Sequence, residues 1–554
     1  MLKKFLLSTA LLGCSQAASA QPFDAGSQLR QIPQAPQPER QEPVFQVAPR
    51  AVEPDTAPAG ARVRVTALVI TGTTLFSQDK LVAASGFTPG SDLSLAEMRA
   101  LAARISAYYN DHGYFLAQAY LPPQAIESGT VTIAVLEGHY GKVSVANHSN
   151  LSDGVAHRVL SGVDSGDIVT SKRLERRLLL LSDIPGVAVR STLAPGAEVG
   201  TSDLLVDIDQ GRRVTGSVEA DNAGNRYTGT YRLGGTVNLN NPAGIGDMLS
   251  LRVLASDSGL AYGRISYQAL VGNATVGVAY AHLKYDLGRE FKALDADGTA
   301  DIASVYASYP LVRTRRSNLY LLGGADMNWF NDKVHLFDSK SRKDSKVLHL
   351  GFAGDFRDDL GGGGSTVYSA ALTYGDLDIK SPVEHAADAL TARSDGGFAK
   401  AEFSAARLQT IAGPLSLYGA VRGQIAFNNL DSSEKMELGG AYGVRAYPEG
   451  EAFGDQGYIA TAEARLQLSH WTPSFPGQLE LIGFVDAGEV KFAHDPWFPG
   501  SNHAHRSAYG AGLSWYAPEG FILKASYARK LGHADATSAP DKDGRAWFQV
   551  VKLF

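Results

Sequence analysis

From about Arg213 to its last residue, the chain alternates between hydrophobic and polar positions in short segments separated by turns. The alternation is clearest at residues 457–469, where even positions carry Tyr, Ala and Leu and odd positions include Glu463 and Arg465. A strand of this kind has one face suited to lipid and one suited to a wet lumen. We count roughly sixteen such segments, each near the length of about 9–11 residues that a tilted membrane strand requires. They start near residues 213, 228, 246, 260, 273, 300, 317, 345, 365, 396, 414, 457, 477, 506, 519 and 544.

These segments predict that residues 212–554 form a 16-stranded antiparallel transmembrane β-barrel. A soluble β-sandwich would alternate as well, but it would carry Glu463 and Arg465 on an unclosed sheet. The two residues lie two positions apart on the same inward face. They either belong to a polar network in the lumen or simply keep the lumen wet.

The last segment closes the chain with Phe554, an ending typical of outer-membrane barrels. One face of this segment carries Ala546, Phe548, Val550 and Phe554, and Lys552 interrupts it. Lys552 either extends its ammonium group to the membrane interface or makes the strand a weaker signal for the machinery that assembles barrels. Phe554 is therefore the candidate terminal residue of the barrel.

Residues 61–138 predict a compact unit of helices and strands. Ser94 and Glu97 form a capping box that opens a helix with apolar residues at helical spacing, and Gly113 ends it. The expected elements in order are a strand at 63–70, a helix at 78–84, the capped helix, and strands at 116–121 and 130–136.

Residues 139–211 repeat the same order of elements. We expect a strand at 141–145, helices at 151–160 and 171–182, and strands at 187–193 and 204–208. The repeat length of about 75 residues exceeds the usual solenoid periods. Each small sheet would leave an edge that could add a strand from a client chain.

Composition agrees with a barrel and disfavours other classes. The chain of 554 residues has 59 Gly, 23 Tyr and 22 Phe, and after the N-terminus it has no apolar window long enough for a spanning helix. Its formal net charge of −6, with no block of Lys and Arg, argues against a nucleic-acid partner.

The N-terminus reads as a secretory signal peptide over residues 1–20. Lys3 and Lys4 precede a short apolar stretch, and an Ala-Ser-Ala site ends at Ala20. A lipoprotein signal at Cys14 is the alternative. Cleavage after Ala20 removes the only Cys, which leaves no disulfide and no thiol chemistry.

Residues 21–60 are rich in Pro and Gln and form the next segment, a plug helix or a linker. Asp24 can cap a short helix that reaches Ile32, and Pro33 and the prolines after it prevent its extension. For residues 33–60 a disordered linker is the favoured interpretation.

The stretch at residues 436–450 is rich in Gly and holds a single Arg, Arg445. This loop could fold back into the barrel and bring Arg445 to Asp486, because a cation withdrawn from water requires a counter-ion. Phe484, Asp486 and Gly488 share one strand face, so Asp486 can point inward while Gly488 leaves room for the loop. The alternative is a solvated Arg445, with Asp486 paired to an arginine of the wall.

No catalytic constellation stands out. The chain has no G-x-S-x-G, H-E-x-x-H or P-loop motif, and His494, His503 and His505 lie in a polar loop without a frame of carboxylates. The tetraglycine at 361–364 lacks the Lys of a phosphate-binding loop and indicates a turn. We expect no enzyme activity, no cofactor and no metal.

A resemblance covers essentially the whole mature chain. The segment from Tyr109 to Gly138, with its Tyr-Leu-Pro-Pro-Gln step and a strand that ends in Glu-Gly, resembles the first POTRA domain of the two-partner secretion transporters of the ShlB/FhaC/HecB type (TpsB). Asp221-Asn222, Val444-Arg445-Ala446-Tyr447 and Phe484-x-Asp486-x-Gly488 resemble the barrel motifs of that family.

The resemblance implies two periplasmic POTRA domains, at 61–138 and 139–211, followed by the barrel with an inward-folded loop at about 427–457. It implies an outer-membrane pore that captures and exports one unfolded partner exoprotein of the haemolysin, adhesin or toxin type. The POTRA domains would bind the partner's N-terminal secretion domain, and biogenesis would require membrane lipid and the barrel assembly machinery. The implied site residues are Val444, Arg445, Tyr447, Phe484, Asp486 and Gly488 at the loop tip and wall, Glu463 and Arg465 in the lumen, and Tyr120, Leu121, Pro122, Gln124, Glu137 and Gly138 in the POTRA motif.

Two positions depart from the family pattern. Ala446 replaces a family Gly, and a left-handed backbone there would be costly for Ala. The helix before Pro33 has only about two turns, which weakens the expectation of a plug. An assembly factor that inserts other barrels is the alternative function from the same superfamily. A barrel enzyme would need a catalytic set and a nutrient porin would lack the POTRA repeats.

Overall fold

The computed structural model describes residues 23–36, 43–47, 61–126, 128–472 and 474–554. The predicted signal peptide and much of the predicted linker lie outside the described residues. The chain divides into two compact units: one holds residues 213–243 and 247–554 together with the N-terminal residues through Glu39, and the other holds residues 40–212 with 244–246.

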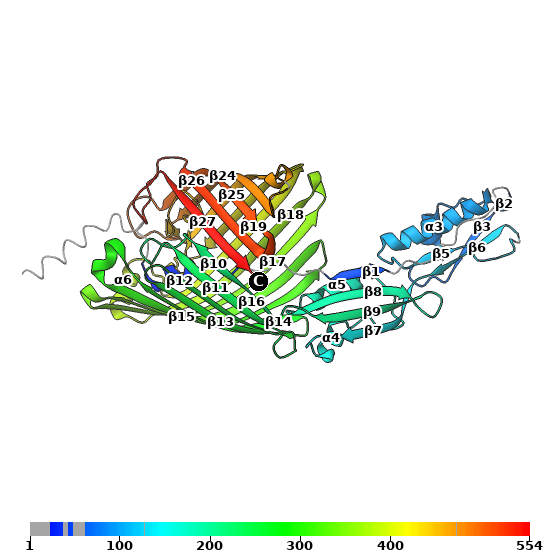
Figure 1. The fold of residues 1–554 in the computed structure, drawn as a ribbon, viewed down its shortest axis with the longest axis horizontal. Helices are drawn as coiled ribbons and strands as arrows, with labels where there is room; N and C mark the ends of the chain where they lie inside the picture. Colours follow the sequence, from blue (N-terminus) through cyan, green and yellow to red (C-terminus); the bar gives the residue numbers. More distant parts are fainter. Residues whose placement is uncertain (1–22, 37–42, 48–60, 127, 473) are drawn as a thin grey trace, which may run out of the picture. The chain divides into compact units, whose positions relative to one another are not determined.

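Within the described residues, sixteen antiparallel strands form one closed barrel, as the alternation predicts (Figure 1). Strand β10 pairs with β27 to close it, with Ser217 opposite Leu553. The strands are β10 (Val214–Asp221), β11 (Arg232–Asn240), β12 (Met248–Ser256), β13 (Leu260–Val271), β14 (Ala274–Asp286), β15 (Ala296–Arg313), β16 (Ser317–Val334), β17 (Ser339–Asp358), β18 (Gly364–Ile379), β19 (Gly396–Ala412), β20 (Leu415–Ala426), β23 (Gln456–Gln467), β24 (Gln478–Lys491), β25 (His503–Tyr516), β26 (Phe521–Lys530) and β27 (Gly544–Leu553).

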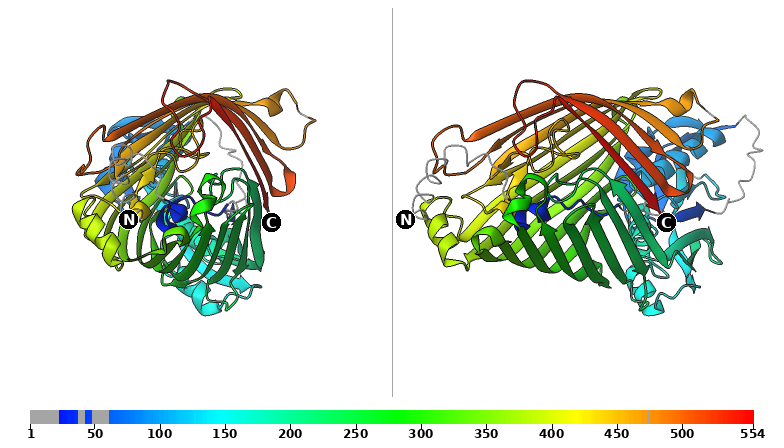
Figure 2. Two further views of the ribbon diagram at one scale, coloured as in Figure 1. Left: turned by 90° about the vertical axis from the view of Figure 1, so that its left-hand side faces the viewer. Right: turned by 60° about the vertical axis from the view of Figure 1, so that its left-hand side comes forward.

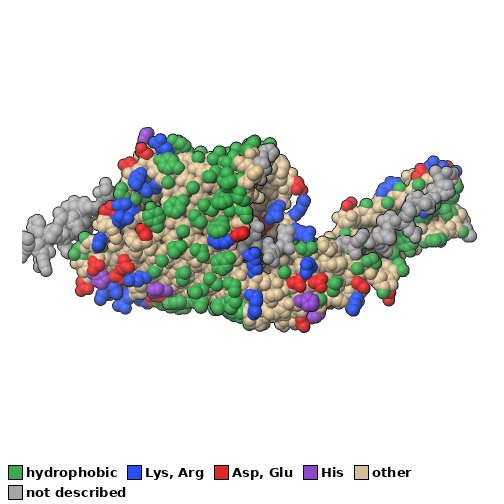
Figure 3. All heavy atoms as spheres, viewed as in Figure 1, with side chains coloured by type: hydrophobic (Ala, Val, Ile, Leu, Met, Phe, Trp, Pro, Cys, Tyr) green, Lys and Arg blue, Asp and Glu red, His purple; other side chains and the backbone are tan. Residues whose placement is uncertain are grey.

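Outward-facing side chains give the barrel a hydrophobic band, and charged side chains gather toward one end (Figure 3). On β17, Leu348 and Leu350 are each 60% exposed, whereas the preceding Val347, on the opposite face of the strand, is buried. Strands β15 to β18 contain 18, 18, 20 and 16 residues. They exceed the expected length because their polar ends continue the hydrogen-bonded ladder, as between Val334 and Ser339.

The chain end is fixed to the first strand. Gly216 donates its N–H to the carbonyl of Phe554 over 2.9 Å, and Phe548, Val550 and Phe554 are exposed on the outer face. Lys552 places its ammonium nitrogen 4.2 Å from the ring centroid of Phe521. A cation–π contact of this kind lets the lysine lie on an aromatic surface.

Residues 61–138 fold as the predicted unit, with two differences. The expected strand at 63–70 breaks at Thr66, whose N–H donates to Gly129 rather than to a ladder partner, and β4 precedes the capped helix. The elements are β2 (Arg62–Val65), β3 (Ala67–Thr71), α2 (Gln78–Ser85), β4 (Ser91–Ser94), α3 (Leu95–Asp111), β5 (Gln118–Tyr120) and β6 (Thr130–Leu136). Ser94 and Glu97 form the capping box, and the sheet order is β3-β6-β5.

Residues 139–210 repeat this order of elements. They form β7 (His139–Asn147), α4 (Asp153–Val159), α5 (Ser171–Ser182), β8 (Val187–Pro195) and β9 (Thr201–Gln210). The expectation of an unstructured linker is wrong for Val44–Val47. These residues form β1, which pairs in parallel with β8 and places Phe45 opposite Ser191. The free sheet edge offers backbone partners, so a short extended segment of the chain itself occupies it.

Helix α1 (Ala25–Arg30) lies inside the ring of barrel strands, where it is the dark blue helix in the left view of Figure 2. Asp24 caps it and forms a reciprocal box with Ser27. Two short strands, β21 (Met436–Glu437) and β22 (Phe453–Gly454), pair at the base of the inward loop, and α6 (Pro382–Leu390) lies between β18 and β19. None of the helices in the described part of the chain is long and apolar enough to cross a membrane.

Candidate functional site

The inward loop brings Arg445 onto Asp486 of β24. The guanidinium donates to both carboxylate oxygens, from Nε to Oδ2 and from Nη2 to Oδ1, each over 2.8 Å. The backbone N–H of Arg445 and the hydroxyl of Thr461 also donate to this carboxylate. Asp486 is fully buried, so it exchanges water for a two-pronged, charge-assisted contact.

Glu463 and Arg465 lie in the same network. Arg445 contacts Glu463 over 3.0 Å, and Arg465 contacts the other oxygen of Glu463 over 2.7 Å. The guanidinium carbon of Arg445 lies 3.4 Å from the ring centroid of Phe484. The two arginines therefore hold two buried carboxylates from neighbouring strands, and Phe484 covers one of these arginines.

Val444, Ala446 and Tyr447 are buried around this contact. Ala446 has a φ outside the left-handed region, so the strain expected from replacing the family Gly does not arise. Tyr447 donates its hydroxyl to the carbonyl of Ala534 over 3.0 Å. A Cβ on Gly488 would lie 3.0 Å from a methyl of Leu438 and 2.8 Å from the carbonyl of Tyr458, so Gly488 allows the loop its close approach to the wall.

Two contacts of the inward loop are not predicted from the sequence. Trp547 on β27 donates its indole N–H to the carbonyl of Arg445 over 2.7 Å. Glu451, fully buried, binds Arg506 on β25 at 2.6 Å and accepts the N–H groups of Thr537 and Ser538. The sequence offers one signal for the second contact, because Arg506 on an inward face needs an acidic partner. It does not reveal which loop residue reaches Arg506.

A cavity of about 480 Å³ lies in the barrel interior beside the loop tip. Charged side chains of both signs and aromatic rings contribute to its wall, which is the expected lining of a wet lumen. The lining includes Arg422, Tyr442, Arg445, Glu463, Arg465 and Lys524.

Helix α1 and its C-cap residue Gln31 are bonded to the segment that connects β10 and β11. Gln28 and Gln31 bond Thr228 and Asn225 over 2.9 and 3.0 Å. A Cβ on Gly26 would lie 2.7 Å from Cβ of Ser433, so α1 packs closely on the base of the inward loop. Helix and loop therefore meet inside the barrel.

In the first α/β unit, Gln124 imitates a strand partner. Its amide nitrogen donates to the carbonyl of Thr132 and its amide oxygen accepts the N–H of Thr132, each over 2.7 Å. The loop containing Leu121 and Pro122 is thereby held against β6. Tyr120, at the end of edge strand β5, is 39% exposed.

Glu137 holds the same unit together from inside. It is 4% exposed and accepts hydrogen bonds from the N–H groups of Thr74 and Leu75 and from the hydroxyl of Tyr109. Burial favours a raised pKa, but these hydrogen bonds outweigh it and lower the pKa of Glu137. A Cβ on Gly138 would lie 2.7 Å from Cβ of Leu116, which accounts for glycine there.

Replacing Glu137 by Gln is expected to cost this unit about 2–3 kcal/mol near neutral pH, because buried donors lose a charged acceptor. A carboxyl whose pKa is lower in the folded than in the unfolded state stabilises the fold at pH values above its unfolded pKa. The wild type should therefore lose its stability advantage over Glu137→Gln as the pH falls through the folded pKa. Hydrogen exchange of the α3 amides, recorded on the full chain in detergent, measures this difference in stability. Equal protection of wild type and Glu137→Gln at pH 7 would contradict the assignment.

Comparisons with known proteins agree with this architecture. The family model described as haemolysin secretion/activation protein ShlB/FhaC/HecB matches residues 200–342 and 358–514, and the ShlB-type POTRA model matches residues 63–138. The heme/hemopexin transporter protein HuxB of Haemophilus influenzae (strain 86-028NP) is 30% identical over 474 residues, which cover 84% of this chain and 82% of that protein.

Two solved structures share the fold. CdiB from Escherichia coli superposes with a TM-score of 0.70 at 19% identity, covering 91% of this chain and 93% of that chain. BamA from Haemophilus ducreyi lacking POTRA domains 1–3 gives a TM-score of 0.50 at 16% identity, covering 89% of this chain and 100% of that one.

The chain therefore belongs to the ShlB/FhaC/HecB family of two-partner secretion transporters. It is an outer-membrane β-barrel with a periplasmic POTRA region, and it exports a partner exoprotein. The alternative of a barrel assembly factor receives less support, because the matching family model and the relative HuxB are both described as secretion or transporter proteins.

Proposed function

We propose that this transporter moves one dedicated, unfolded exoprotein of the haemolysin, adhesin or toxin type through its barrel without bond-making chemistry. The repeated order of elements in residues 61–138 and 139–211 supports two POTRA domains that capture the partner's N-terminal secretion domain. The relative HuxB is named a heme/hemopexin transporter, so a haem-binding exoprotein is one candidate partner. Membrane lipid and the barrel assembly machinery complete the proposed set of partners.

Within the barrel, we propose that Arg445 and Asp486 fix the inward loop, and that α1 closes the pore at rest. The observation that supports this most strongly is the two-pronged contact of Arg445 with a fully buried carboxylate. A buried ion without a partner is costly, so the loop has one strongly favoured position on the wall. Val444, Tyr447 and Phe484 would keep water from that contact.

The test is secretion of a candidate partner exoprotein, which is first sought in the reading frames next to that of this chain. In cells that lack the transporter, the exoprotein should remain in the periplasm, and expression of the full chain should return it to the cell surface, where added protease can digest it. Loss of other outer-membrane barrels on depletion, with normal export of the exoprotein, would instead identify an assembly factor.

A further inference from the structure

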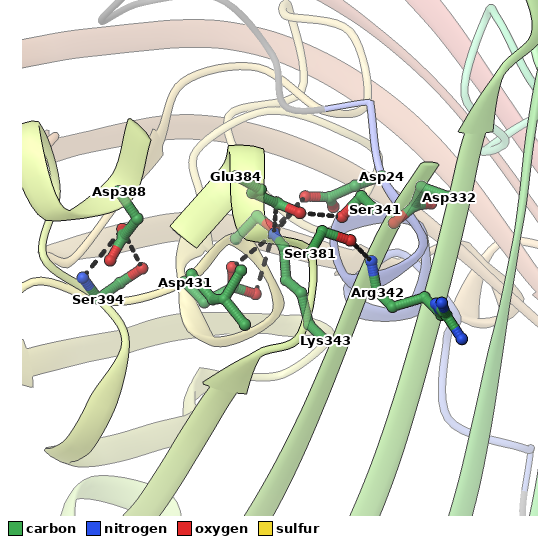
Figure 4. A network of polar contacts seen from close by, with 12 residues as sticks. Asp24, Asp332, Ser341, Arg342, Lys343, Ser381, Glu384, Asp388, Ser394 and Asp431 are labelled. Carbon is green, nitrogen blue, oxygen red and sulfur yellow. Dashed lines mark hydrogen bonds and ion pairs between the residues drawn. The ribbon is translucent and has the colours of Figure 1, made fainter. Parts of the chain in front are cut away.

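The N-terminal end of α1 lies beside one lysine that contacts three acidic side chains (Figure 4). The ammonium group of Lys343 on β17 lies 2.9 Å from Asp431, 3.1 Å from Glu384 of α6 and 3.8 Å from Asp24, the cap of α1. The side chain of Lys343 is 11% exposed. One largely buried cation thus joins the helix, the base of the inward loop and α6.

Asp24 is surrounded by groups of its own sign as well. Asp431 and Glu384 share its lysine, and Asp332 lies at the same end of the helix, where it accepts the N–H of Ala25 over 2.8 Å. Ser432 and the backbone of Ser27 donate hydrogen bonds to Asp24. Like charges at such separations repel, so the position of Asp24 depends on the charge of Lys343.

The C-terminal end of α1 shows the same pattern with arginines. Arg232 binds Asp221 on the wall at 2.8 Å and donates to the carbonyl of Gln31 over 3.1 Å. Arg252 likewise binds Glu219 at 2.7 Å and donates to the carbonyl of Pro33 over 3.2 Å. Arg232 and Arg252, like Lys343, therefore each have an acidic partner elsewhere in the barrel.

This pattern has a consequence for the departure of α1. Leaving a buried charge unpaired is strongly unfavourable. When α1 leaves, Lys343 retains Asp431 and Glu384, Arg232 retains Asp221, and Arg252 retains Glu219. The wall therefore keeps no unpaired cation. Arg30 of α1 gives up its ion pair with Glu402 at 3.1 Å, and Glu402 retains Lys400 at 3.5 Å.

We propose that Lys343, Arg232 and Arg252, each already neutralised by an acidic partner in the barrel, form a seat that binds α1 reversibly. This proposal rests on the proposed role of α1 in closing the pore. Lys343 is its most sensitive member, because it compensates Asp24 while Glu384 and Asp431 compete for its charge. The two sides of that competition predict substitutions with opposite effects.

Lys343→Met removes the cation and leaves Asp24 facing two carboxylates, so the open fraction of the channel should rise by about tenfold. Glu384→Gln removes one competitor and one repelling charge, so the open fraction should fall by about threefold. Both effects should shrink to less than about twofold in an Asp24→Asn background, because they act through the charge of Asp24.

The measurement is single-channel recording of the full-length protein in planar lipid bilayers. Lys346→Met is the matched control: it lies on the same strand with an exposed side chain, and it should behave as wild type. Deletion of residues 23–36 provides the fully open reference and tests the role of α1 separately.

The outcomes separate the two proposals. If the deletion does not open the channel, α1 does not close the pore and the seat loses its function. If the deletion opens the channel while Lys343→Met and Glu384→Gln both match wild type, the seat is wrong and the plug stands. If both substitutions open the channel equally, they act by loosening the structure, which overturns the competition at Lys343.

Discussion

Replacing Arg445 by Ala should leave the barrel inserted in the outer membrane and reduce export of the exoprotein at least about tenfold. The substitution leaves Asp486 and Glu463 buried near each other without their shared cation. Loss of one partner from a buried pair costs about 3–5 kcal/mol. The loop would then leave the wall, while the closed ladder of strands would hold the barrel together.

Export is measured as surface exoprotein per inserted transporter. Arg529→Ala is a suitable control, because Arg529 is an exposed arginine on β26 with a distant ion-pair partner at 3.9 Å. Arg445→Lys should restore export only in part, since an ammonium group cannot make the two-pronged contact. Normal export by a correctly inserted Arg445→Ala protein would falsify the proposed role of the contact.

Removal of residues 23–36 should convert a pore that is mostly blocked by α1 into a steadily open, large channel. The segment contributes α1, which fills part of the interior and bonds Thr228, Asn225 and Arg232. Without it, those polar groups face water and ions can pass. Conductance in planar bilayers should rise by about tenfold or more, as expected when a population shifts from mostly closed to mostly open.

A cross-link tests the same helix in the opposite direction. Gln28→Cys combined with Thr228→Cys puts thiols on two residues whose native side chains bond over 2.9 Å. Because a Cys side chain is shorter than that of Gln, the thiols are joined by a short thiol-reactive linker that contains a disulfide. The linker should hold α1 in the barrel and stop export, reduction of its disulfide should restore export, and each single substitution should export normally. Unimpeded export by the cross-linked pair would contradict the requirement that α1 leaves the pore.

The alternation of hydrophobic and polar side chains predicted most of the barrel, because each strand has one face toward the wet lumen and one face toward lipid. The predicted starts of β13, β17 and β27, at residues 260, 345 and 544, compare with Leu260, Ser339 and Gly544. The largest of these errors is at β17, where the polar end of the strand carries no lipid-facing signal. Strand β1 was missed because its partner β8 is distant in sequence.

The site was predictable where the spacing of residues within a motif fixes which side chains share a face. Phe484, Asp486 and Gly488 share a face by the two-residue period of a strand, and the Gly-rich loop offered one cation for Asp486. The contacts of Glu451 with Arg506 and of Lys343 with Asp24 were not predictable in this way. They join residues 55 and 319 positions apart, and only the closed barrel brings them together.

The most direct measurement of export through this barrel places a photo-reactive residue at Tyr442, which lines the interior cavity. The exoprotein, arrested during export by a folded domain at its C-terminal end, should cross-link to this position in the full-length transporter. The same label at exposed Tyr527 on the outer surface should give no product. Surface delivery of the exoprotein with no cross-link at position 442, or with equal cross-linking at position 527, would contradict passage through the barrel.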